Sequence, residues 1–419
     1  MLEVKFSNKE QYMTFHSALH TRIQKEYMAQ WMTYPDHFPE SKRQFSYIEK
    51  RIWEIKFNHF LRVIKKEFKY QKPNKTRILE RSKVFFEENL AYPHEQLTLI
   101  FSNEMLTATK DFFRKAWAFD SELSQNEIFQ ALRNVWVMLG LQSFFGKEIK
   151  ITPSLLAYSL LYPYTDNLID SPTICKSEKL EFCKRFALRL DGKPVEAMSQ
   201  IESRIFNLVE MIESEFERET HPELFESLLA IHNAQTQSLK LVSTKENLSE
   251  DERFQICIDK GATSVIADGF LVMGNLDEKQ HHFLYEYGAY LQILDDLQDA
   301  RDDYEEGIMT YFSKNLSQTK LDHSLCKTYY LGKSFYQNIE IWYPNQLSFK
   351  GLIERSFGFL LLASVFQNQN DFTKDFVHKI EKHTPFRFSF INKKKTEMEP
   401  LRQVLLEKAD AYKANGFEL

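Results

Sequence analysis

Residues that interrupt helices are scarce in this chain, because its 419 residues include only 12 glycines and 12 prolines. From about residue 120 onward, apolar residues recur at helical spacing, and no alternating run is long enough to build a sheet. The pattern predicts an all-α bundle with a polar site between facing helices. The expected helices cover residues 124–145, 153–170, 177–190, 194–217, 222–242, 250–274, 278–305, 318–341, 349–367 and 371–382.

The first part of the chain differs from the rest, since residues 1–115 are highly charged and mix aromatic and basic residues in a helical rhythm. They are predicted to form an N-terminal helical extension on a helical core of residues 116–390, which a C-terminal helical tail, residues 391–419, follows. Basic runs such as residues 65–69 (KKEFK) are interpreted as a solvated face. The alternative is contact with an acidic partner or a membrane surface.

Composition argues against several classes of protein. A net charge of −5 provides no basic field for nucleic acid, so none is expected as a partner. The four cysteines show neither zinc-site spacing nor a disulfide framework. No secretory signal is visible at the N-terminus, and the longest apolar run, residues 357–366, is too short to cross a bilayer. These features predict a cytoplasmic protein.

Two acidic patches carry the strongest functional signal. Asp295 and Asp299 end an apolar stretch, and Asp166 and Asp170 repeat the same spacing of four residues far upstream. On a helix each pair shares one face, where like charges repel unless a cation lies against them. Magnesium prefers oxygen ligands and takes one or two carboxylates together with substrate phosphates. The alternative for either pair alone is a solvated acidic face. The predicted metal ligands are Asp166, Asp170, Asp295, Asp296 and Asp299.

A segment rich in small residues, 259–274, places Lys260 and Ser264 on one helix face, with Asp268 one turn further. Small side chains let helices approach closely, and a lysine among them gains from a nearby anion. Lys260 and Ser264 are therefore predicted to bind substrate. The alternative is close helix packing with Lys260 reaching outward to solvent.

Another polar helix face is expected in residues 229–240, where Gln235 lies one turn from Ser238 and is predicted to face the cavity. His232 lies on the same side and is interpreted as a structural histidine with a satisfied hydrogen bond. Arg185 and Arg189 are either phosphate ligands or part of a solvated basic face.

Together these motifs resemble the class I isoprenoid synthase superfamily, which includes trans-prenyltransferases, squalene and phytoene synthases, and terpene cyclases. Residues 260–265 (KGATSV), residues 234–238 (AQTQS) and the motif of DDxxD type at 295–299 are most similar to bacterial large-terpene synthases like tetraprenyl-β-curcumene synthase. The resemblance covers about residues 120–390. It implies a class I isoprenoid-synthase-like helical bundle that uses Mg²⁺, with more than one ion.

The resemblance also implies roles for individual residues. Asp166 and Asp170 would bind Mg²⁺ on one wall, and the aspartates of the 295–299 motif would bind it on the other. Lys260 would reach the diphosphate oxygens, and Gln292 would face the cavity one turn below the second motif. The chain departs from prenyltransferases after the first motif, since their arginine pair is replaced by residues 171–176 (SPTICK).

The sequence therefore predicts a Mg²⁺-dependent terpenoid synthase that ionises an allylic prenyl diphosphate, releases diphosphate and forms a terpene product. Tyr162, one turn before Asp166, is predicted to contact the substrate and limit its chain length. The alternatives are a trans-prenyltransferase that condenses prenyl diphosphates, including enzymes like squalene and phytoene synthases, and a non-catalytic superfamily member. An apolar product would also favour a loose association with a membrane surface.

Overall fold

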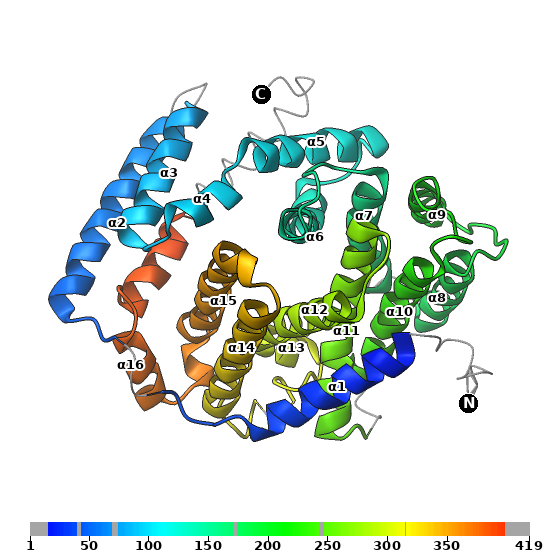
Figure 1. Ribbon diagram of the computed structural model, residues 1–419. Coiled ribbons are helices and arrows are strands. Elements are labelled where there is room, and N and C mark those ends of the chain that lie inside the picture. The colour runs from blue at the N-terminus through cyan, green and yellow to red at the C-terminus, as the bar shows by residue number, and fades with distance from the viewer. Residues whose placement is uncertain are drawn as a thin grey trace.

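The computed structural model describes residues 16–39, 43–68, 74–170, 174–242, 247–314 and 316–398. In these ranges the chain is helical and contains no β-strand, which confirms the predicted all-α class (Figure 1). The helices are α1 (His16–Thr33), α2 (Tyr47–Phe68), α3 (Lys75–Asn89), α4 (His94–Ile100), α5 (Asn103–Phe119), α6 (Gln125–Phe144), α7 (Pro153–Asp170), α8 (Lys176–Leu190), α9 (Gln200–Glu213), α10 (Pro222–Ser238), α11 (Glu250–Met273), α12 (Glu278–Gln298), α13 (Ala300–Glu306), α14 (Asp322–Trp342), α15 (Leu347–Gln367) and α16 (Lys374–Lys382).

The two central helices, α11 and α12, meet at a contact made by glycine on both sides. A Cβ atom built on Gly261 would lie 2.3 Å from the backbone oxygen of Gly288, and one built on Gly288 would lie 2.2 Å from the oxygen of Gly261. Only hydrogen fits at either position, so the small residues of the 259–274 segment serve close helix packing. The contact also brings Lys260, which precedes Gly261, close to Gln292, which lies one turn after Gly288.

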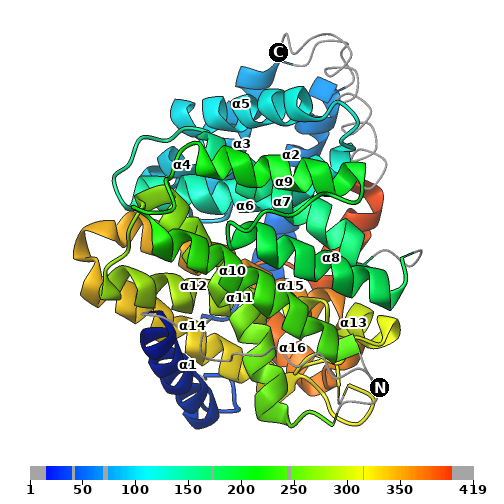
Figure 2. The ribbon, with the colours of Figure 1, turned by 90° about the vertical axis from the view of Figure 1, so that its right-hand side faces the viewer.

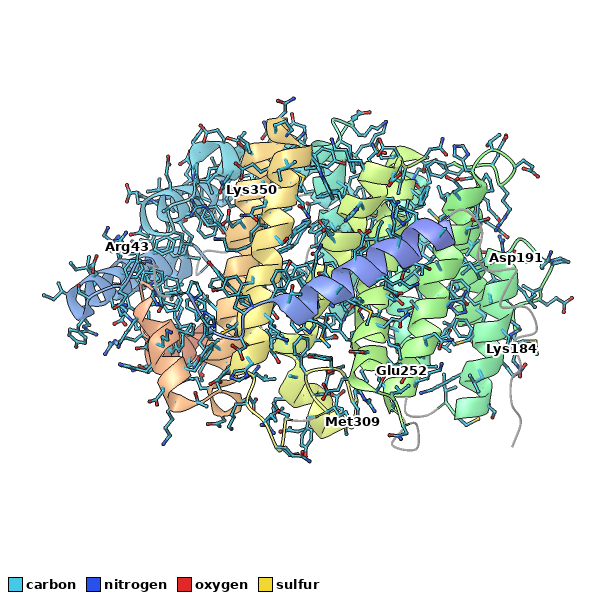
Figure 3. The ribbon with its side chains drawn as sticks, turned by 60° about the horizontal axis from the view of Figure 1, so that its bottom comes forward. Arg43, Lys184, Asp191, Glu252, Met309 and Lys350 are labelled. Carbon is cyan, nitrogen blue, oxygen red and sulfur yellow. The ribbon has the colours of Figure 1, made fainter. Side chains whose placement is uncertain are left out.

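Other helices surround this central pair. Helix α10 packs along α11, α6 and α7 lie against each other and against α11, and α14 and α15 pack on α12 (Figures 1 and 2). Helix α1 crosses the outside of α12 and α14, as Figure 3 shows. Helices α14 and α15 therefore cover the central pair on the side of α12, and α6, α7 and α10 cover it on the side of α11, where the site described below lies.

Most helix boundaries agree with the sequence patterns because side-chain caps mark them. Ser124 and Ser249 each form a capping box with the glutamate three residues later. Some boundaries differ from expectation, among them the following two. Helix α9 begins only at Gln200, where the side chain of Ser199 accepts the hydrogen bond of the cap. The helix predicted over residues 278–305 is interrupted at Asp299, and α13 continues after it.

The N-terminal region contacts the rest of the molecule in two places, through α1 and through the pair of helices α2 and α3. Helices α2 and α3 form a hairpin at the edge of the molecule (Figure 1). The ring of Trp53 on α2 contacts Phe386, and the carboxylate of Glu54 accepts two hydrogen bonds from Arg387 at 2.8 and 2.7 Å. Among the described residues, no helix is long and apolar enough to cross a membrane.

Candidate active site

A cavity of about 400 Å³ lies between α6, α7, α10, α11 and α12. Most of its wall is apolar, contributed by residues such as Leu161, Phe186, Leu228, Ile231 and Leu291. This volume lies within the range of about 300–1,000 Å³ that is usual for small-molecule sites. The cavity can therefore hold an apolar molecule of ordinary metabolite size.

One end of the cavity is strongly acidic. A second hollow of about 170 Å³ adjoins the first, and the two share Gln235, Lys260, Gln292 and Asp295 in their walls. Two segments far apart in the sequence supply the acids: α7 provides one, and the end of α12 with α13 provides the others. The acidic residues in its wall are Asp166, Asp295, Asp296, Asp299 and Asp303.

The aspartates at the end of α12 and in α13 are crowded and poorly solvated. Burial raises the pKa of Asp296 to about 6. Burial, and then repulsion from Asp295, raises the pKa of Asp299 to about 6. Burial followed by repulsion from Asp296 and Asp299 raises the pKa of Asp303 to about 7. Each shift means that the folded chain holds more negative charge here than its own surroundings can stabilise.

Lys260 is the only cationic side chain in the described wall of the acidic hollow. Burial disfavours its charge, but Tyr162, Asp166 and the α12 aspartates outweigh burial and raise the pKa of Lys260 above its usual value. Five carboxylates thus face one ammonium group. The excess of negative charge would be relieved by cations bound among the carboxylates.

Two glutamines orient carboxylates at the junction of the hollows. Nε2 of Gln235 on α10 donates to Oδ1 of Asp166 at 2.7 Å, and Nε2 of Gln292 donates to Oδ1 of Asp296, also at 2.7 Å. The other oxygen of Asp296, Oδ2, is buried without a nitrogen or oxygen donor in the described part of the chain. Each glutamine therefore fixes one carboxylate through one of its oxygens.

The donor set suits a metal ion only in part. Among the described residues, no three His, Cys, Asp or Glu side chains are placed to hold one ion by themselves. The acidic oxygens instead stand on facing walls, and an all-oxygen set of this kind suits Mg²⁺, which keeps waters and takes its remaining ligands from substrate phosphates. The residues present therefore fit ions that a bound diphosphate helps to coordinate.

Polar groups also occur at the apolar end of the cavity. The hydroxyl of Tyr158 donates to the backbone oxygen of Ser264 at 3.3 Å, and Asn134 donates to Oδ1 of Asp268 at 3.2 Å. Asp268 is fully buried behind this wall, and burial raises its pKa well above the usual value. These groups place a small polar cluster beyond the acidic end.

Most of the residues singled out from the sequence line one of these two hollows. Tyr162 and Ser264 line the larger cavity, and Ser238 lines the acidic hollow. The side chain of Asp170 lies outside the described part of the structure. The predicted residues that line the acidic hollow are Asp166, Gln235, Lys260, Gln292, Asp295, Asp296 and Asp299.

Three other basic or neutral candidates have structural partners. Arg185 is paired with Glu202 and Arg189 with Glu213, so both face α9 rather than a phosphate. His232 contributes to the cavity wall, but its Nε2 lies 2.8 Å from the backbone oxygen of Cys183. This hydrogen bond agrees with the interpretation of a structural histidine, and burial lowers the pKa of His232 to about 4.

Two residues near the site received no role from the sequence. Asp303 extends the series Asp295, Asp299 by a further four residues, and this spacing was the signal that could have found it. Arg133 on α6 lines the larger cavity, and its charge offsets part of the rise that burial causes in the pKa values of Tyr162 and Asp299. No pattern around Arg133 marks it, because it reaches the site only when α6 packs beside α7.

In comparisons with known proteins, no family model matches this chain and no curated protein sequence matches it. The resemblance to class I isoprenoid synthases therefore rests on the motifs.

Proposed function

We propose that this protein is a Mg²⁺-dependent terpenoid synthase that ionises an allylic prenyl diphosphate. One observation carries the proposal: acids from α7 and from the end of α12 face a single lysine at the polar end of an otherwise apolar cavity. A diphosphate with its metal ions suits the polar end, and a hydrocarbon chain suits the remainder. A prenyl diphosphate combines these two parts in one molecule.

Each wall would have its own task. Asp166 on one side and Asp295, Asp299 and Asp303 on the other would hold the metal ions, and Lys260 would bind diphosphate oxygens directly. When bound, Mg²⁺ supplies neutralisation of the charge that develops on the diphosphate as it leaves. The C–O bond then breaks, its electron pair leaves with the diphosphate, and an allylic cation stays in the cavity.

The apolar wall would control what the cation does next. Leu161, Phe186, Leu228 and Ile231 hold the chain folded and exclude water, and ring faces such as those of Tyr158 and Phe186 stabilise positive charge. Cyclisation or proton loss inside this wall gives a hydrocarbon, whereas capture of a water gives an alcohol.

The basic residues near the cavity favour this reaction over condensation with a second prenyl diphosphate. Condensation needs a separate pocket for a second anion, since an uncompensated diphosphate in a closed site is very costly. Arg185 and Arg189 are already paired with glutamates. Arg133 lines the same cavity as Lys260, so both charges would serve the diphosphate of a single allylic substrate.

The test is incubation of the purified protein with Mg²⁺ and a series of prenyl diphosphates from ten to thirty-five carbons, followed by mass spectrometry. The proposal expects one allylic diphosphate to be consumed alone, with a terpene and pyrophosphate as products, at a rate that added isopentenyl diphosphate leaves unchanged. Formation of a longer diphosphate only when isopentenyl diphosphate is present would establish a prenyltransferase instead. Thermal protection by a prenyl diphosphate without turnover would establish a non-catalytic binding protein.

A further inference from the structure

The outward side of α2 carries the largest group of exposed apolar side chains on any described helix. Tyr47, Ile48, Ile52 and Ile55 are 64%, 69%, 51% and 61% exposed. The three isoleucines follow a spacing of four and then three residues, so they share one face of the helix. The other described helices expose at most two large apolar side chains each, which is ordinary for a protein surface.

These isoleucines are not needed for packing within the molecule. The opposite side of α2 already makes the internal contacts, where Trp53, Leu61 and Ile64 are buried and Glu54 is paired with Arg387. A helix that only covered the core would carry polar residues outward. The exposed isoleucines therefore indicate a partner outside the described part of the chain.

The same outward face becomes cationic along the second half of the helix. Arg62 and Lys66 continue the line of the isoleucines, and Lys56 lies beside it. All three are exposed, and none forms an ion pair with another described residue. The first half of the face therefore offers apolar surface, and the second half offers positive charge.

The acidic residues of α2 do not cancel this charge. The carboxylate of Glu49 accepts hydrogen bonds from Ser46 and Arg43, and Glu67 is buried and paired with Arg77. With Glu54 held by Arg387, each acid of the helix is paired within the molecule. The charge of this face is thus complementary to an anionic surface.

We propose that the outer face of α2 docks on an anionic membrane surface. Ile48, Ile52 and Ile55 would enter the boundary between headgroups and acyl chains, while Arg62 and Lys66 contact lipid phosphates. A second copy of the chain is a poorer occupant. A parallel pair of these helices would bring cations against each other, and an antiparallel pair would set the cations of each helix against the isoleucines of the other. An acidic protein or a nucleic acid would use the cations and leave the isoleucines without a role.

The position of α2 permits this docking. The α2–α3 hairpin forms one edge of the molecule in Figure 1, and in Figure 3 Arg43, just before α2, lies at the opposite end from Lys184 and Asp191 on and after α8. Membrane contact would leave the helices around the cavity uncovered. The inference does not depend on the proposed reaction, although an enzyme with an apolar substrate would gain from a position on a membrane.

Vesicle co-sedimentation of the full chain tests the proposal. We expect the protein to bind vesicles of phosphatidylcholine with phosphatidylserine and to bind phosphatidylcholine vesicles at least tenfold more weakly. The variant Ile52→Asp/Ile55→Asp should bind the anionic vesicles at least tenfold more weakly than wild type. Its matched control is Met198→Asp/Ile341→Asp, at positions 72% and 71% exposed on other parts of the surface, which should bind like wild type.

Charge reversal separates a membrane from other acidic partners. Arg62→Glu/Lys66→Glu should lose binding to anionic vesicles, whereas Lys25→Glu/Lys333→Glu, with the same change in net charge at other exposed positions, should keep most of it. Circular dichroism establishes that each variant is folded. Absence of binding to anionic vesicles, or loss of binding in both pairs alike, would overturn the proposal. Binding to heparin or polyglutamate that matches vesicle binding in strength and survives the isoleucine substitutions would establish a soluble acidic partner instead.

Discussion

Replacing Asp299 by asparagine should stabilise the metal-free protein at neutral pH, although it removes a residue proposed to bind metal. Asp299 lies where α12 ends and α13 begins, partly buried, with Asp295, Asp302 and Asp296 as neighbours. Burial and these neighbours together raise its pKa to about 6. Asparagine has nearly the same shape and carries no charge, so the substitution removes repulsion and little packing.

The size of the effect follows from the pKa. The pKa of an aspartate in the unfolded chain is about 3.9. A pKa of about 6 in the folded state therefore corresponds to roughly 3 kcal/mol of lost stability once the carboxylate is ionised. Part of the side chain reaches solvent, which screens the repulsion, and we expect about 1–2 kcal/mol. Below about pH 4 the carboxyl is protonated in both states and costs nothing. As pH rises to 6, the unfolded chain releases its proton first, so the stability of the folded state falls.

The assay is urea unfolding of wild type and Asp299→Asn in EDTA at pH 5 and pH 7.5. Wild type should lose more stability between the two pH values, and the variant should be the more stable protein at pH 7.5. Glu219→Gln, at an exposed position remote from the site, should behave like wild type. Added Mg²⁺ with pyrophosphate should reverse the order, because it stabilises wild type and not the variant. A variant less stable than wild type at pH 7.5 in EDTA would refute the crowding of charge described here.

Four further outcomes are expected from the same geometry. Lys260→Ala should weaken pyrophosphate binding at least tenfold in calorimetry. An unchanged affinity would show that this lysine serves only helix packing. Tyr162→Ala should shift turnover toward longer prenyl diphosphates in a competition assay, whereas an identical length profile would place the ring outside the substrate path. Gly288→Ala should lower the unfolding free energy by about 1–3 kcal/mol in urea, because its Cβ would collide with the backbone of α11; an unchanged midpoint would contradict the glycine contact. In wild type, the buried carboxylate of Asp268 should lower the unfolding free energy by up to about 1.4 kcal/mol per pH unit above about pH 4, and Asp268→Asn should remove this loss. The measurement is the difference in unfolding free energy between the variant and wild type across pH 4–7. A difference that does not change with pH would contradict a raised pKa of this carboxyl.

Local signals in the sequence accounted for much of the fold. Helix α6 begins where Ser124 and Glu127 form a capping box, and α7 begins at Pro153 after Thr152, whose hydroxyl accepts from the N–H of Leu155. The interruption at Asp299 had no such signal. No glycine or proline stands there, and the break coincides with the crowding of charged carboxylates, which depends on what surrounds the helix.

The residues of the candidate site also include some that local sequence patterns could predict and some that they could not. Asp166, Asp295 and Lys260 could be named from the sequence, because spacing of carboxylates and a lysine among small residues are local patterns. Arg133 could not, because its place in the cavity depends on how α6 packs against its neighbours. Nor could the sequence decide whether Arg185 faces a phosphate, since its partner Glu202 is carried by another helix.

The most direct test of the central claim is a calorimetric titration of pyrophosphate into the protein with Mg²⁺ and with EDTA. The claim is that Asp166 on one wall and the aspartates at the end of α12 and in α13 on the other jointly hold metal ions around a diphosphate beside Lys260. Wild type should bind pyrophosphate at least tenfold more tightly with Mg²⁺ than with EDTA, and Asp166→Asn/Asp295→Asn should lose that difference while remaining folded. Equal affinity under the two conditions, or a double variant that keeps the full effect of Mg²⁺, would contradict the account.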